Sequence, residues 1–120
     1  MATKNFIISG LLLMLSFSFL SCSSENEDDL LPEERCEEQP ASLSGDVIPI
    51  INQNCAVSGC HVSGSNRVNL SVKENILQYA NQIRNFTQSG YMPRQGSGLT
   101  LSDSEKETIF CWVENGAMDN

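Results

Sequence analysis

Histidine and clustered basic residues are nearly absent from this chain of 120 residues. It has one histidine, and its 7 lysines and arginines stand against 15 aspartates and glutamates. Because the basic residues form no cluster, we expect no nucleic-acid partner. The sequence offers no Ser-His-Asp set and no catalytic carboxylate pair, so we do not predict an enzyme.

Apolar alternation and internal repeats are also missing. Because no segment alternates apolar and polar residues over the length of a strand, no strand is predicted, and we expect an all-α domain. Helices are predicted over about 45–54, from Ser71 and from Ser102. The second and third begin with capping boxes, because Glu74 and Glu105 follow the cap residues by three positions. The second helix carries an apolar stripe at Val72, Ile76, Tyr79 and Ile83.

The N-terminus has the pattern of an exported lipoprotein. Lys4 precedes an apolar segment, 6–20, which has the length of a signal-peptide core and is too short for a predicted membrane span. The segment 19–22 resembles a bacterial lipobox, although phenylalanine stands where leucine is usual. We therefore predict a signal peptide over 1–21 and lipidation of Cys22. An ordinary cleaved signal with a free thiol and an uncleaved anchor are the alternatives.

An acidic segment follows Cys22. Eight of the 15 acidic residues lie between Glu25 and Glu38. This composition cannot bury apolar surface, so 22–43 is predicted to be a flexible tether. Acyl chains would anchor it to the bacterial cell envelope, on the periplasmic or cell-surface side of the outer membrane. The remainder, 44–120, has seven acidic and five basic residues and is predicted to be one small domain.

Two cysteines and the single histidine are grouped at Cys55, Cys60 and His61. This grouping suits covalent haem attachment, in which each thiol adds to a haem vinyl group and the adjacent histidine binds the iron. The usual spacer has two residues and this one has four, of which Ser58 and Gly59 could bulge outward. A disulfide between the cysteines and a zinc site are the alternatives, although zinc lacks a second tight cysteine pair.

A methionine lies in a loop rich in glycine, over 90–99. Met92 precedes Pro93, which fixes the backbone beside it. A thioether held in this way could bind iron opposite His61, so we predict Met92 as the second axial ligand. Ordinary hydrophobic contact is the alternative role, and Met118 is the weaker candidate ligand because it lies near the chain end.

The region 48–120 resembles a small bacterial monohaem cytochrome c domain, here on a lipoprotein and with a Cys-x4-Cys-His variant of the haem motif. The resemblance implies thioethers at Cys55 and Cys60, with His61 as proximal and Met92 as distal ligand. It also implies a cytochrome c-like fold of three or four short helices around the haem, with the first and last helices crossing. The matching pieces are 46–51, 55–61, 90–93 and 110–117.

The cysteine count predicts one disulfide. With Cys22 assigned to lipid and two cysteines to haem, Cys36 and Cys111 remain, and an even remainder in an oxidising compartment favours a bond between them. The alternative is a buried apolar Cys111 and a free thiol at Cys36.

Together these features predict a membrane-anchored one-electron carrier with one covalent haem c, which exchanges electrons with redox partner proteins. The alternative is a haem-free, disulfide-stabilised surface lipoprotein that acts as a binding or assembly module.

Overall fold

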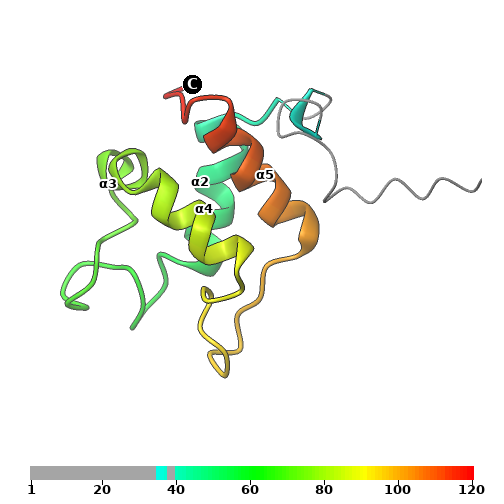
Figure 1. Ribbon diagram of the computed structural model, residues 1–120. Helices are drawn as coiled ribbons and strands as arrows, with labels where there is room; N and C mark the ends of the chain where they lie inside the picture. Colours follow the sequence, from blue (N-terminus) through cyan, green and yellow to red (C-terminus); the bar gives the residue numbers. More distant parts are fainter. Residues whose placement is uncertain (1–34, 38–39) are drawn as a thin grey trace, which may run out of the picture.

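The computed structural model describes residues 35–37 and 40–120, and within these ranges the protein is all-α (Figure 1). No strand occurs in these ranges, which confirms the predicted class. The predicted signal peptide and Cys22 lie outside the described residues. None of the helices that the structure describes is long and apolar enough to cross a membrane. The elements in order are η2 (Leu43–Val47), α2 (Ile48–Asn54), α3 (Lys73–Gln78), α4 (Ala80–Gln88) and α5 (Asp103–Glu114).

The first helix begins earlier than predicted, with a π-helical turn, η2, that continues directly into α2. Ser42 is the N-cap, and its hydroxyl accepts a hydrogen bond from the Gly45 N–H. The Asp46 carboxylate in turn accepts from the N–H of Ser42 at 2.8 Å. Leu43 is fully buried. The folded domain therefore reaches further toward the N-terminus than the predicted boundary at residue 44.

The second helix does not begin at the predicted capping box. Its first residue is Lys73, and its N-cap, Val72, makes no side-chain cap hydrogen bond. The predicted cap residue, Ser71, instead donates its N–H to the Asn69 side chain at 3.0 Å. Asn75 donates to the Asn69 carbonyl at 2.8 Å. Asn69 thus organises this turn in place of the Ser71 hydroxyl, and the expected box at Ser71 is wrong.

The predicted second helix is two helices. Tyr79 leaves helical geometry with φ −104° and ψ 16°, which ends α3, and α4 starts at the next residue. Ile76 and Ile83 are both buried, one on each side of this break. The predicted stripe is therefore confirmed at Ile76 and Ile83 but is wrong at Val72, which is exposed, and the prediction of a single helix is wrong.

The third predicted helix is α5, and its start is confirmed. Ser102 and Glu105 form both hydrogen bonds of a capping box. The helix ends at Glu114 with Asn115 as its C-cap, and Gly116 follows with φ +97°, a conformation that glycine adopts at little cost.

The first helix and α5 run antiparallel. At one end Leu43 donates its N–H to the Asn120 side chain at 2.8 Å. At the other end Asn54 donates to Glu105 at 3.3 Å. Between these ends the buried side chains form one core, and α5 contacts both η2 and α4. The largest fully buried side chains of this core are those of Trp112, Leu43, Ile51, Ile76, Ile109 and Val47.

A disulfide between Cys36 and Cys111 joins residues 75 apart in sequence, as the cysteine count led us to expect. Both cysteines are buried. Beside them Arg35 forms an ion pair with Glu107 and lies 4.2 Å from the centre of the Phe110 ring. Part of the segment assigned to the tether is thus attached to the outer face of α5.

We expect Cys36→Ser to lower the free energy of unfolding by about 4 kcal/mol, because the disulfide closes a long loop in the unfolded chain. Urea titration of the exported protein measures this loss. A reducing agent should bring the wild type to the same stability and leave the variant unchanged. A wild-type stability that does not respond to the reductant would contradict the role of this bond.

Candidate functional site

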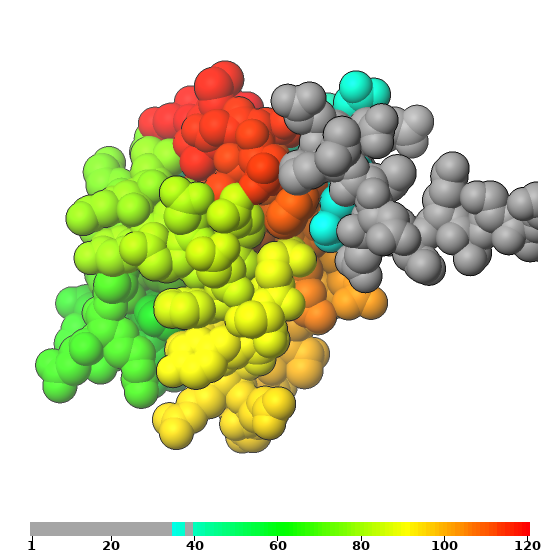
Figure 2. Space-filling view, in the orientation of Figure 1, coloured from blue at the N-terminus to red at the C-terminus, as the bar shows by residue number. Residues whose placement is uncertain are grey.

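A cavity of about 640 Å³ lies between the loop after α2, helix α4 and the loop after α4. Figure 2 shows these two loops, in green and yellow, at the end of the molecule away from the red C-terminal residues. The lining of the cavity includes all four residues predicted to hold a haem: Cys55, Cys60, His61 and Met92. The structure therefore brings together the predicted site from two loops that are distant in sequence.

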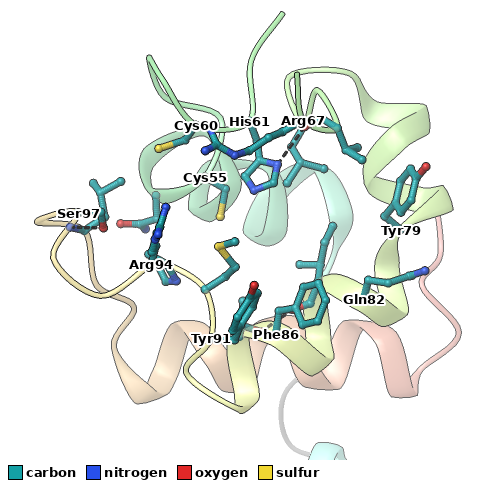
Figure 3. A pocket seen from close by; sticks show the side chains of 18 of the residues that line it. Cys55, Cys60, His61, Arg67, Tyr79, Gln82, Phe86, Tyr91, Arg94 and Ser97 are labelled. Atoms are coloured by element: carbon teal, nitrogen blue, oxygen red, sulfur yellow. Dashed lines mark hydrogen bonds between the residues drawn. The ribbon is translucent and has the colours of Figure 1, made fainter. Parts of the chain in front are cut away.

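The end of α2 positions the two thiols. Cys55 is the C-cap of α2, and its N–H donates to the Ile51 carbonyl at 2.8 Å. The chain then turns back, so that the N–H of His61 donates to the Cys55 carbonyl at 3.0 Å. Cys55 and His61 point into the cavity, while Cys60 lies toward its edge (Figure 3). Neither Cys55 nor Cys60 is in a disulfide.

One ring nitrogen of His61 is already hydrogen-bonded. Its Nδ1 lies 3.0 Å from the carbonyl oxygen of Val68. A carbonyl only accepts, so Nδ1 carries the proton and Nε2 of the neutral ring has a lone pair. Among the described residues none forms a hydrogen bond with Nε2. This arrangement, in which a backbone carbonyl orients the ring, is typical of metal-binding histidines.

Burial keeps Cys55 protonated. Loss of water around the thiol, together with the nearby Cys60 and Glu105, raises its pKa from 9.0 to about 11. A thiol of this kind is a weak nucleophile at neutral pH, because the thiolate is the reactive form. Cys55 is therefore poorly suited to thiol–disulfide exchange.

The second loop brings Met92 to the same cavity. Gly90 follows α4 with φ +70° and reverses the chain. The N–H of Met92 then donates to the Phe86 carbonyl at 3.0 Å, which ties the loop to the end of α4. Tyr91 packs beside Phe86 with ring centres 5.1 Å apart, and both rings are exposed.

Met118, the weaker candidate ligand, does not line this cavity. This residue is 60% exposed, and its carbonyl accepts a hydrogen bond from the Trp112 indole at 3.0 Å. The chain end therefore packs against α5, away from His61.

Sequence reasoning did not identify Arg67 and Val68 as members of the site. Arg67 lines the cavity and donates to the Gly59 carbonyl at 2.7 Å, and Val68 accepts from His61. No pattern in the sequence signals these contacts, because each depends on how the loop folds back.

A second group of potential metal ligands lies on the other face of α5, at Cys36, Glu107 and Cys111. Both sulfurs are joined in the disulfide, and the carboxylate pairs with Arg35. These three residues therefore serve to attach the segment before η2 to α5.

No protein-family model, curated protein or solved structure matches this chain.

We expect the protein to lose stability between pH 9 and about 11 through the Cys55 thiol. The folded chain keeps the Cys55 proton where the unfolded chain has lost it, so this contribution is complete below pH 9 and is lost toward pH 11. The shift corresponds to about 3 kcal/mol. Urea titrations of wild type and Cys55→Ala should show a smaller loss in the variant. Equal losses would contradict the assignment.

Proposed function

We propose that this protein is a membrane-anchored one-electron carrier with one covalently attached haem c and a cytochrome c-like fold. One observation carries the proposal: a single cavity is lined by Cys55, Cys60, His61 and Met92. Two thiols beside a histidine suit covalent haem attachment, and a histidine with a methionine is an axial pair of electron-transfer cytochromes.

The cavity fits such a group in size and character. Its volume of about 640 Å³ falls in the range of roughly 300–1,000 Å³ that is usual for cofactor sites. Apolar side chains supply much of the wall, which suits a large apolar ring. They are Val68, Leu70, Ile83, Phe86, Pro93 and Leu99.

In this proposal Cys55 and Cys60 hold the group covalently, and His61 presents Nε2 to the iron. The hydrogen bond from Nδ1 to Val68 fixes the ring orientation. Met92 supplies a sulfur ligand that favours the reduced state and raises the potential relative to a second histidine. The bound haem supplies iron that changes between ferrous and ferric states.

The proposed role does not include catalysis. His61 and Met92 would both bind the iron, which would leave it no open position for a substrate. The apolar side chains of the cavity wall would limit the contact of the bound group with water. Electron exchange with redox partner proteins then requires only that the edge of the group lies near the surface.

The proposed anchor is a lipid on Cys22, which places the domain outside the inner membrane at the end of a tether. The attachment of Cys36 to α5 supports an oxidising compartment, because disulfides persist there. Periplasmic and cell-surface positions are both compatible with this proposal.

A second candidate is a haem-free lipoprotein that acts as a binding or assembly module. The Cys36–Cys111 disulfide favours it, because this bond stabilises a small domain without a cofactor. The same cavity would then bind another apolar ligand.

Covalent haem distinguishes the two candidates. We expect the full chain, produced with a cytochrome c maturation system, to give a haem-stained band in denaturing electrophoresis and a reduced-minus-oxidised spectrum of a c-type cytochrome. The double variant Cys55→Ala/Cys60→Ala should give neither, because no thiol is left at the site.

The matched control is Cys36→Ala, which removes a cysteine outside the cavity and should keep its covalent haem. A colourless wild-type protein from a competent host would contradict the carrier and favour the haem-free module.

A further inference from the structure

The segment 67–70 forms a strap along the haem motif. Arg67 donates from its guanidinium to the Gly59 carbonyl at 2.7 Å. His61 donates from Nδ1 to the Val68 carbonyl at 3.0 Å, and Leu70 donates its N–H to the His61 carbonyl at 2.9 Å. Three hydrogen bonds therefore connect 67–70 to 59–61, although no strand forms.

The three bonds act on different parts of the motif. Those of Val68 and Leu70 hold His61, whereas the bond of Arg67 holds the spacer that separates the two cysteines. Its acceptor, Gly59, directly precedes Cys60 and has φ +78°. A guanidinium carries several donors in a rigid plane, which suits it to fix an exposed carbonyl.

The spacer needs such a contact because it has four residues. Cys55 is buried at the end of α2 and is fixed by that helix. Cys60 is more exposed and lies toward the edge of the cavity (Figure 3), so its position depends on the conformation of the spacer. The N–H of Cys60 donates to the Val57 carbonyl at 2.9 Å. At the start of the spacer the Ala56 N–H donates to the Ile51 carbonyl of α2 at 2.8 Å, whereas at its end, beside Cys60, the Arg67 guanidinium donates to Gly59.

We propose that Arg67 is a positioning residue for the second thioether. It holds the long spacer so that Cys60 reaches the same haem as Cys55, and it therefore compensates for the unusual length of the motif. This inference rests on the proposed function. In the step it assists, the Cys60 sulfur bonds to one vinyl carbon, its proton goes to the other, and the double bond becomes single; no oxidant or leaving group takes part.

The expected effect is a selective loss of the second bond. Removing one hydrogen bond of this kind lowers the population of the competent spacer by about fivefold. Attachment through Cys55 should continue, because α2 positions that thiol without Arg67. The product of Arg67→Gln should therefore be enriched in chains with a single thioether.

The alkaline pyridine spectrum of the haem tests this directly, because its main visible band moves to longer wavelength for each vinyl group left intact. Full-length wild type should show two thioethers, and Cys60→Ala provides the reference for one. Arg67→Gln should lie between them and nearer Cys60→Ala, and Arg67→Lys, which keeps a charged donor, should recover toward wild type. The control is Arg84→Gln, which removes a guanidinium that pairs with Glu114 and should match wild type.

Circular dichroism of each variant confirms that the helices are kept. A wild-type spectrum from folded Arg67→Gln would overturn the inference and leave the proposed function intact. Complete loss of haem from Arg67→Gln, while Cys60→Ala keeps one bond, would also contradict it, since Arg67 would then act on more than Cys60. A wild-type chain without covalent haem would overturn both proposals.

Discussion

The antiparallel packing of the first helix against α5 is the constraint on which the rest of the structure depends. Asn54 and Glu105 join these helices at the end where the first helix passes into the segment 55–61 and α5 emerges from the second loop. The loop after α2 and the loop before α5 therefore meet the helix pair at this end, and both extend away from it on the same side of the molecule (Figure 1). The cavity that Cys55 and Met92 share follows from this arrangement, because each lies on one of the loops.

The opposite end of the helix pair is closed by the C-terminal residues of the chain. The indole N–H of Trp112 and the backbone N–H of Leu43 both donate to the last residues of the chain, and Lys73 pairs with Asp119. The exposed Lys73 pair adds little, whereas the fully buried Trp112 side chain contributes a large apolar surface. With the Cys36–Cys111 disulfide on the outer face of α5, a small domain is stabilised at the end away from its cavity.

Local patterns in the sequence predicted the parts of the fold that depend on neighbouring residues. The capping box at Ser102 is one, because its two hydrogen bonds lie within one turn. The same pattern at Ser71 failed because Asn69 organises that turn, and apolar periodicity did not reveal the break at Tyr79 because the buried stripe continues across it. The site residues were predicted from chemistry, whereas Arg67 became visible only once the loop folding was known.

The far-red absorbance of the ferric protein tests most directly the central claim that His61 and Met92 approach one iron from two loops. A thioether bound to ferric iron gives a weak charge-transfer band there. The account predicts this band in the wild type and its loss in Met92→Ala. The band should remain in Met118→Ala, because Met118 is exposed and lies outside the cavity. A band that survives in Met92→Ala, or a haem-loaded wild type without the band, would contradict the account.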